Sequence, residues 1–587
     1  MNVTEFLKVN TEKYATRAAI GFKKDEKWKE LSWMDFSRIV YKTANALKEF
    51  GIKNGDHVGI YSDNSAEWIV FDLATMAIGA VSVPLYSTAN AEQVSYILKD
   101  AGVRVLLVGN QEQYELAFDL MENGLEIEQL IMAKKRIWTK KTKSVYLDDF
   151  IKNAAETLEI EPKDEDDLAT LIYTSGTTGE PKGVMLSHGN FTKAFAAHFE
   201  FFKFESFEKE HSLAFLPLTH VFERSWTLLC LTGAAKVSFL ENTKLIASTL
   251  VEVKPTLMCA VPRFYQKIYA GVNGMVEKSS PLKKKLFAWA LKTGTERAEL
   301  LRVEKKPSFS LRAKYAIANG LVFQKIKNKM GGNLWFMPCG GASISPEVTR
   351  FFAALGIPMT VGYGLTETTA TLTAFPSTFF EHGSCGIPLT GTEIKIGEDD
   401  EILVKGPGIM KGYYKKPAQT ASVFTQDGWF RTGDAGKIDA KGNLYITDRI
   451  KDLMKTSNGK YLAPQLIENI LLNDEDISQV MLIAEARPFA SAIIVPNFEV
   501  LEPKLASLNL KSSDWTELTI EPALLEYYTN LLAQLQIGLQ GHEKIKKFIL
   551  LPREFEIESG EITPTLKVKR KVVLEKYQNE IEKLYNA

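Results

Sequence analysis

Short apolar runs alternate along most of the chain with segments whose apolar residues recur every three or four positions. The runs at 103–109, 235–241 and 255–262 are rich in strand-forming residues, whereas residues 67–80 have the spacing of a buried helix. Strands that alternate with helices are typical of α/β folds with largely parallel sheets. We therefore predict an α/β architecture for the larger part of the chain.

The pattern changes after about residue 395, where glycine-centred turns separate short strands as they do in hairpins. From about 448 it changes again. A helix is expected after Pro464, followed by two strands at 480–486 and 491–497, a helix at 523–540 and a strand at 548–554. We predict a large N-terminal domain with α/β sheets and a β-rich part, residues 1–447, and a small α+β domain, residues 448–587.

Composition excludes several classes of protein. A chain of 587 residues exceeds the size of a single core, which supports more than one domain. The 71 basic and 72 acidic residues give a net charge of -1, so nucleic acid is not expected as a partner. The 4 cysteines form no CxxC pair, which argues against a zinc site or a disulfide framework and favours a reducing cytoplasm. Neither a secretory leader nor a membrane span is expected.

Residues 278–329 stand out by their charge. They contain 14 Lys and Arg residues but only three acidic ones, which gives this segment a net charge of +11. Apolar residues, among them Leu286, Phe287 and Trp289, are interleaved at near-helical spacing. A basic amphipathic helix of this kind binds anionic membrane surfaces. The segment predicts peripheral contact with the inner surface of a membrane, and the alternative is a solvated helical face.

The strongest local signal for chemistry is YTSGTTGEPKGV at 173–184, which follows a strand-like run and precedes a helix-like one. Glycines let backbone N–H groups approach an anion, hydroxyls add donors, and a lysine adds positive charge, so the segment predicts a phosphate-binding strand-to-helix loop. It lacks the Walker A pattern, so the chemistry of P-loop enzymes is not implied. The expected phosphate ligands are Thr174, Ser175, Gly176, Thr177, Thr178, Gly179 and Lys182.

This loop resembles the signature of the adenylate-forming superfamily, which contains acyl-CoA synthetases, luciferases and peptide-synthetase adenylation domains. Further motifs follow in the family's order: GYGLTETT at 362–369, GWFRTGD at 428–434 and GNLYITDRIKDLMKTSNGKYLAP at 442–464. The resemblance covers nearly the whole chain. It implies that ATP, Mg²⁺ and coenzyme A are used to convert a carboxylic acid first to an acyl-adenylate and then to a thioester.

The resemblance also assigns the nucleotide site. Tyr363 is expected to present its ring to the purine, Thr366 to donate to phosphate, and Glu367 to bind Mg²⁺ together with Thr177. Segment 340–343 resembles the backbone that lines the adenine pocket. The remaining residues expected in this part of the site are Gly340, Gly341, Ala342 and Gly364.

Asp434, expected at the end of a strand-turn unit, matches the residue that takes the ribose hydroxyls, and Arg449 supplies positive charge for ribose or phosphate. The alternative for these two residues is a structural ion pair. Lys451 matches the hinge about which the small domain rotates between the half-reactions. Lys455 and Gly459 match the segment that faces the coenzyme A arm in the thioester-forming state.

The C-terminal run ITPTLKVKRK, residues 562–571, resembles the segment of the lysine that completes adenylation. Lys567 is the predicted catalytic residue, because a cation between carboxylate and α-phosphate stabilises the charge that builds up in the transition state. The common family pattern has a glycine before this lysine, whereas Leu566 stands here. Lys569 is the alternative.

FLPLTHVFERSW at 215–226 resembles the segment whose histidine lies at the mouth of the acyl pocket, which makes His220 a substrate-proximal residue; a structural core histidine is the alternative. Together with the basic insert and the TPTLK run, this segment is most similar to long-chain fatty acyl-CoA synthetases. We therefore expect a long-chain fatty acid–CoA ligase with a fatty acid, ATP and coenzyme A as substrates. The alternatives are a fatty acyl-AMP ligase that loads an acyl carrier protein and a non-catalytic nucleotide-binding or membrane-scaffold protein of the same fold.

Overall fold

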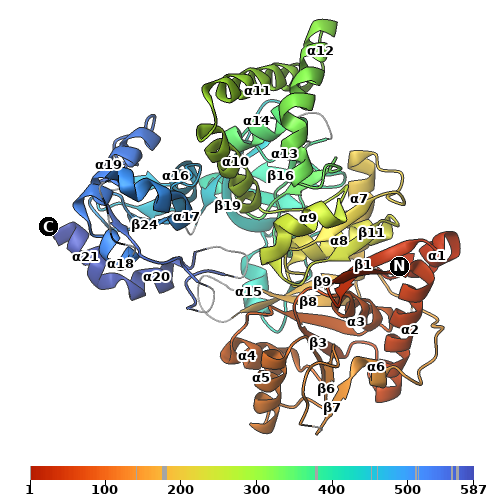
Figure 1. Cartoon of the computed structure of the whole chain (residues 1–587). Helices are drawn as coiled ribbons and strands as arrows, with labels where there is room; N and C mark the ends of the chain where they lie inside the picture. The colour runs from red at the N-terminus through yellow and green to blue at the C-terminus, as the bar shows by residue number, and fades with distance from the viewer. Residues whose placement is uncertain are drawn as a thin grey trace.

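The computed structural model describes residues 2–586 except 141, 161, 175–180, 358, 377–380, 451–452, 459, 509, 511, 513, 557–558 and 564–567 (Figure 1). The α/β character expected of the N-terminal part is confirmed, as is the small α+β C-terminal part. Within the described residues no helix has the length and apolarity needed to cross a membrane.

An eight-stranded sheet forms the base of the N-terminal part, with strand order β18-β9-β8-β4-β3-β5-β6-β7. Its middle strands pair in parallel and are fully buried, as in β5, because helices cover both faces. The strands are β3 (His57–Tyr61), β4 (Val81–Leu85), β5 (Val105–Val108), β6 (Gln129–Met132), β7 (Ser144–Tyr146), β8 (Leu168–Thr174), β9 (Lys182–Ser187) and β18 (Gly412–Tyr413). The helices between them are α2 (Trp33–Phe50), α3 (Ala66–Ala77), α4 (Ala91–Ala101), α5 (Gln111–Glu122), α6 (Leu147–Phe150) and α7 (His188–Phe202).

The predicted phosphate-binding loop leads from strand to strand, not from strand to helix. β9 turns back antiparallel to β8, with Thr174 opposite Lys182, and α7 begins only afterwards. The expectation of a direct strand-to-helix loop is therefore wrong. Residues 175–180 lie outside the described residues, but both ends of the loop are held by the β8–β9 ladder.

A second sheet has the order β10-β11-β1-β2, and β12 pairs in parallel with β13 beside it. Residues 255–262, expected as a strand, make only isolated bridges at Leu257 and Ala260, because the run is short and begins with Pro255, which cannot donate to a ladder. The elements of this region are β1 (Ala18–Lys24), β2 (Lys27–Ser32), β10 (His211–Ala214), β11 (Lys236–Phe239), β12 (Met337–Cys339), β13 (Met359–Val361), α1 (Phe6–Tyr14), α8 (Val221–Thr232), η1 (Thr243–Leu245), α9 (Ile246–Val253), α10 (Pro262–Glu277) and α14 (Pro346–Leu355).

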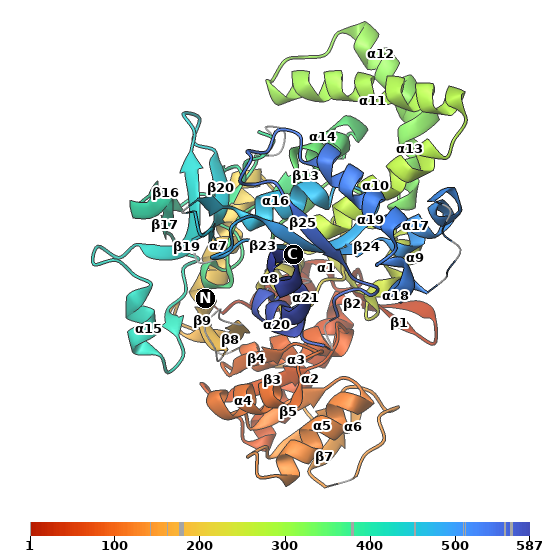
Figure 2. The same ribbon diagram turned by 90° about the vertical axis from the view of Figure 1, so that its left-hand side faces the viewer.

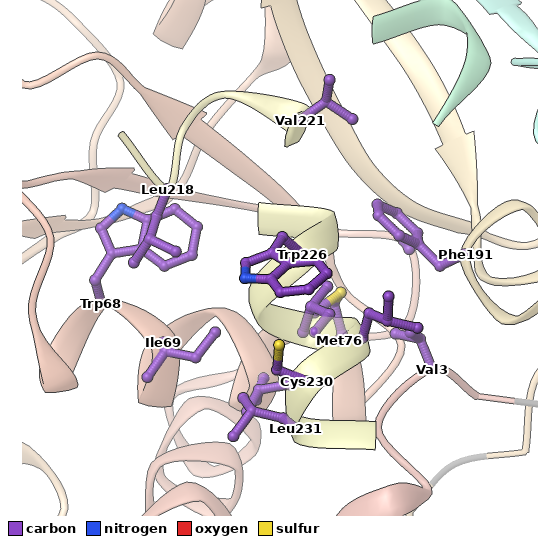
Figure 3. Packing of buried hydrophobic residues seen from close by; sticks show 14 of the residues in the cluster. Val3, Trp68, Ile69, Met76, Phe191, Leu218, Val221, Trp226, Cys230 and Leu231 are labelled. Carbon is purple, nitrogen blue, oxygen red and sulfur yellow. The ribbon is translucent and has the colours of Figure 1, made fainter. Parts of the chain in front are cut away.

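Helix α8 is embedded in the largest hydrophobic core. Figure 3 shows Trp226, Cys230 and Leu231 on α8 between side chains of α3 and Phe191 of α7. Arg224 on the same helix is fully buried and pairs with the equally buried Asp72 of α3. Loss of one partner of such a buried pair costs several kcal/mol, so the pair ties α8 to α3.

The basic segment forms α11 (Pro281–Arg302), α12 (Phe309–Ala318), the π-helical turn η2 (Asn319–Phe323) and α13 (Gln324–Lys329). Gly294 lets α11 approach α14 closely, because a Cβ there would lie 2.3 Å from the carbonyl oxygen of Ala354. Figures 1 and 2 show α11 and α12 at the outer edge of the molecule, far from the eight-stranded sheet.

The hairpins predicted after residue 395 form an antiparallel sheet of order β16-β17-β19-β20. The predicted domain boundary at 447/448 falls inside β20. The elements here are η3 (Thr366–Thr368), β14 (Thr373–Ala374), β15 (Ile387–Pro388), β16 (Glu393–Ile396), η4 (Glu398–Asp400), β17 (Glu401–Lys405), α15 (Pro417–Ser422), β19 (Phe430–Ile438) and β20 (Leu444–Arg449).

The C-terminal part has a three-stranded sheet, β23-β24-β25, with its own hydrophobic clusters. The helix after Pro464 and both expected strands are present. The elements are β21 (Met454–Lys455), β22 (Tyr461–Leu462), α16 (Pro464–Leu471), β23 (Ile477–Ile483), β24 (Ser491–Pro496), α17 (Phe498–Leu501), η5 (Glu502–Leu508), α18 (Trp515–Leu518), α19 (Pro522–Leu535), β25 (Lys547–Leu550), α20 (Arg570–Lys576) and α21 (Gln578–Asn586). This part touches the rest of the chain where Asn469 donates to Ser343.

Candidate active site

One cavity of about 980 Å³ collects most of the residues singled out in the sequence. Its walls come from the eight-stranded sheet, from the segments after β12 and β13, from β19 and β20, and from the C-terminal part. The predicted site residues that line it are Thr174, Lys182, His220, Gly340, Gly341, Ala342, Tyr363, Gly364, Thr366, Glu367, Asp434 and Arg449.

The two ends of the predicted phosphate-binding loop, at Thr174 and Lys182 of the β8–β9 hairpin, line this cavity. Lys182 begins β9, and its ammonium group lies 4.9 Å from the centre of the Tyr413 ring. Such a contact holds the lysine side chain beside the ring without neutralising its charge. Ser175, Gly176, Thr177, Thr178 and Gly179 lie outside the described residues.

Glycines bring two backbone segments together at the floor of the cavity. Gly362 donates to the carbonyl oxygen of Cys339 at 2.9 Å, which continues the β12–β13 pairing and sets the 340–342 segment beside Tyr363. At Gly364 a Cβ would lie 1.8 Å from the carbonyl oxygen of Ala370, so only glycine fits there. The backbone can therefore approach a ligand closely at both segments.

Glu367 lies in the short turn η3 and is fixed by an aromatic hydroxyl. Tyr413 donates to its Oε1 at 2.9 Å, and Met410 donates to its backbone carbonyl oxygen. Burial, followed by the nearby Glu367 carboxylate, raises the pKa of Tyr413, so this hydroxyl stays a donor. A carboxylate has about four acceptor positions, so Glu367 keeps capacity for a cation.

Asp434 and Arg449 face each other across β19 and β20. The predicted position of Asp434 at the end of a strand-turn unit is wrong, because it lies inside β19, directly opposite Arg449. Arg449 Nε lies 3.3 Å from Asp434 Oδ1, so the ion pair considered from the sequence is present. Tyr363 donates to the other oxygen, Oδ2, at 2.6 Å. Both residues nevertheless line the cavity.

His220 caps the N-terminus of α8 and marks the start of an apolar branch of the cavity. Its Nδ1 accepts from the backbone N–H of Phe222 at 3.2 Å, which leaves the ring proton on Nε2. Beyond it the wall is almost entirely apolar, formed by Ala194, Phe195, Phe202, Phe204, Phe222, Trp226, Leu229 and Phe336, with His198 and Ser225 among them.

The chain that forms this polar chamber and apolar branch matches the sequence models of a known family. The model of the AMP-binding enzyme family matches residues 7–414, and that of the AMP-binding enzyme C-terminal domain matches residues 451–587. The chain belongs to the AMP-binding enzyme family. The resemblance inferred from the motifs is thereby confirmed.

Relatives of this AMP-binding enzyme match it over nearly its whole length. It is 31% identical over 563 residues to a long-chain-fatty-acid–CoA ligase of Mycobacterium bovis, covering 96% of this chain and 93% of that protein. It is 31% identical to a long-chain-fatty-acid–CoA ligase of Homo sapiens, covering 100% and 92%. Its fold is similar to that of an anthranilate CoA ligase in complex with anthranoyl-AMP, with a TM-score of 0.76 and 18% identity over 99% of this chain and 98% of that one.

The C-terminal part of the AMP-binding enzyme closes one side of the cavity. Thr563 and Lys569 line it, and they flank the segment 564–567 that contains Lys567, which lies outside the described residues. An Ile562–Val568 bridge closes the base of this segment. Gly459 also lies outside the described residues, and Lys455 is exposed on β21, apart from the residues that line the cavity.

Two groups of site residues were missed in the sequence. Tyr413 touches both Lys182 and Glu367, yet only its place in a Gly-Tyr-Tyr run marks it. The aromatic residues of the apolar branch come from α7, α8 and the segment before β12, and each looks like an ordinary core residue in the sequence. Neither group carries a local pattern that separates it from the core.

Proposed function

We propose that this chain is a long-chain fatty acid–CoA ligase, which forms acyl-AMP and pyrophosphate and then acyl-CoA and AMP. The observation that carries the proposal is the single cavity in which a polar chamber at Tyr363, Glu367 and Asp434 continues past His220 into an apolar, aromatic-lined branch. A carboxylate at that junction would have its alkyl chain in the branch and its oxygens beside the chamber. The names of the relatives support the same activity.

In the first half-reaction, ATP would bind in the polar chamber. Lys182 and the loop at 175–180 would hold the phosphates, the 340–342 segment and Tyr363 would take the adenine, and Asp434 would accept from the ribose hydroxyls. Asp434 already accepts from Tyr363 and pairs with Arg449, which orients the lone pairs that remain.

Mg²⁺ fits the donors at Glu367. This ion is usually held by one or two carboxylates together with substrate phosphates, and among the described residues no cluster of three or more metal-binding side chains occurs. Glu367, with Thr177 as its partner, would hold the ion. When bound, Mg²⁺ neutralises charge on the phosphate oxygens.

Lys567 would stabilise the transition state of adenylation. A carboxylate that attacks the α-phosphate brings two anions together, and a lysine ammonium group between them lowers that barrier. The proposal is supported by Thr563 and Lys569, which bring both ends of the 564–567 segment to the cavity wall. The same arrangement would suit Lys569 as the alternative.

The second half-reaction would require rotation near Lys451. Lys455 is exposed and apart from the cavity in this arrangement, as expected of a residue that acts only after the small domain has turned. Rotation would withdraw Lys567 and bring Lys455 and Gly459 to the coenzyme A arm.

The two half-reactions can be tested separately with Lys567→Ala. The variant should lose fatty-acid-dependent pyrophosphate exchange but still convert pre-made acyl-AMP and coenzyme A to acyl-CoA. Equal loss of both halves would contradict the assignment of Lys567. Transfer to an acyl carrier protein but not to coenzyme A would favour an acyl-AMP ligase, and no pyrophosphate release with any acid would favour a non-catalytic scaffold.

We also propose that the protein is cytoplasmic and binds the inner surface of a membrane through residues 278–329. On α12 and the following π-helical turn, the apolar residues Phe309, Ile317 and Leu321 are 86%, 55% and 51% exposed. Arg312 and Lys314 on the same helix are also exposed. Exposed apolar residues interleaved with basic ones are suited to an anionic lipid surface.

A further inference from the structure

The apolar branch of the cavity runs between two helices. From α7 it is lined by Ala194, His198 and Phe202, which recur every four residues and therefore share one face. Eight residues of helix span about 12 Å, so the branch extends at least that far along α7. The branch therefore has a defined direction and length.

The mouth and the far end can be told apart along α8. Near the mouth, Phe222 lies beside Gly340: a Cβ on Gly340 would be 3.4 Å from the Phe222 ring. One turn further, Trp226 stacks on Phe336 with ring centres 6.0 Å apart and an interplanar angle of 25°. The branch therefore runs from His220 past Phe222 towards Trp226.

Four rings close the far end. Phe336 is 3% exposed and meets the edges of Phe202 and Phe204 at 5.1 and 5.2 Å, in addition to its stacking on Trp226. Phe202 and Phe204 stack on each other at 5.2 Å. Mutual contacts of this kind lock each ring, so the four form a rigid barrier and not a loose lining.

Behind the barrier lies the protein surface. Trp335, 41% exposed, contacts Phe204 and Phe336 from the outer side at 6.3 and 5.7 Å, and its Nε1 donates to Glu210. Trp335 does not line the cavity. Phe336 is thus backed on its outer side by the partly exposed Trp335.

We propose that Phe202, Phe204, Trp226 and Phe336 form the terminal wall of the acyl-binding branch and set the longest fatty acid that the enzyme accepts. This inference rests on the proposed function. Each methylene that enters an apolar branch gains roughly fourfold in binding, up to the point at which the chain meets a wall it cannot displace. Beyond that point a longer chain must leave methylenes in water or force the rings apart.

The test is the chain-length profile of Phe336→Ala. For the wild type and the variant, kcat/KM is measured with ATP, Mg²⁺ and coenzyme A for a series of saturated fatty acids. Phe336→Ala should move the optimum to longer acids and raise the ratio of kcat/KM for a long acid to that for a short acid by about tenfold. A general loss of stability would lower kcat/KM by the same factor for every acid and leave this ratio unchanged.

Two further variants complete the test. Phe118→Ala removes a buried ring of similar exposure, 6%, at a core position that does not line the cavity, and it should leave the chain-length ratio unchanged. Leu229→Phe enlarges a side chain that lines the branch and should shift the optimum to shorter acids. These two variants separate a change in the wall from a change in stability.

If Phe336→Ala still forms acyl-CoA and its chain-length profile is unchanged, the proposal that these rings limit chain length is wrong, but the proposed function stands. A wild type that forms no acyl-CoA from any fatty acid would overturn the proposed function instead. A shift of the chain-length profile of equal size in Phe118→Ala would also contradict the proposed role of the four rings, because the shift would then result from lower stability.

Discussion

The hydroxyl of Tyr363 donates a hydrogen bond to Asp434 at 2.6 Å, which joins the loop after β13 to strand β19 at the wall of the cavity. Both side chains are buried, at 7% and 4% exposure. Burial, followed by the neighbouring Asp434 carboxylate, raises the pKa of Tyr363 well above its usual value, so the bond persists across the working pH range. The bond fixes the carboxylate that we propose for ribose binding.

Tyr363→Phe should therefore weaken ATP binding more than it slows the chemistry. The ring stays for the purine, but Asp434 loses a donor, and a hydrogen bond to a charged group contributes about 1.5–3 kcal/mol. We expect KM for ATP to rise about tenfold while KM for the fatty acid and kcat stay close to the wild-type values. An equal rise in both KM values would argue against a ribose-specific role for Asp434.

Glu561 should position the segment that carries Lys567. Its fully buried carboxylate accepts from Arg553, Ser559 and Tyr577 and pairs with Lys576, and these partners outweigh burial and hold its pKa well below the usual range. Glu561→Gln should lower pyrophosphate exchange at least tenfold but leave thioester formation from pre-made acyl-AMP intact. Glu575→Gln, an exposed change on α20, is the control. Equal losses in both half-reactions would indicate a purely structural role.

Glu223 should make the stability of the protein depend on pH. Burial raises its pKa from 4.5 to about 8, and its Oε2 accepts from the backbone of Leu216 near the His220 loop. Between these two values the unfolded chain has lost a proton that the folded chain keeps. This carboxyl therefore lowers the free energy of unfolding as pH rises, by at most about 1.4 kcal/mol per pH unit.

Glu223→Gln should remove that contribution. Urea unfolding of both proteins at pH 5, 6, 7 and 8 gives the comparison, and the variant should gain stability relative to the wild type as pH rises. Parallel pH dependences in the two proteins would contradict a protonated Glu223 in the folded state.

The exposed apolar residues Phe309 and Ile317 of α12 should control binding to lipid. Phe309→Ser with Ile317→Ser should reduce cosedimentation with vesicles that contain anionic phospholipid at least fivefold, because the exposed apolar side chains are lost while the basic charge stays. Ile537→Ser, at a site 80% exposed in the C-terminal part, should have no effect. Unchanged binding in the double variant, or no preference for anionic over zwitterionic vesicles, would contradict the proposal.

Local periodicity was sufficient to predict most of the regular elements. The apolar run at 103–109 contains β5, and Pro464 begins α16, because a buried strand and a helix N-terminus each have a local signature. The order of the motifs was also sufficient to predict which segments meet at the cavity. Both kinds of signal depend on neighbouring residues or on a family pattern.

Features that depend on two distant segments were not predictable in the same way. The antiparallel return of β9, the register that sets Asp434 opposite Arg449, and the contact of Phe202 with Phe336 all arise from tertiary pairing. A short run such as 182–187 is compatible with a strand or the start of a helix until its partner is known. The terminal wall escaped detection because its rings resemble core residues.

The most direct test of the proposed ligase activity is to incubate the purified protein with a long-chain saturated fatty acid, ATP, Mg²⁺ and coenzyme A and to identify the products by mass spectrometry. We expect acyl-CoA, AMP and pyrophosphate in equal amounts, with pyrophosphate exchange that needs the fatty acid but not coenzyme A. Absence of both acyl-CoA and fatty-acid-dependent pyrophosphate exchange across the whole chain-length series would contradict it.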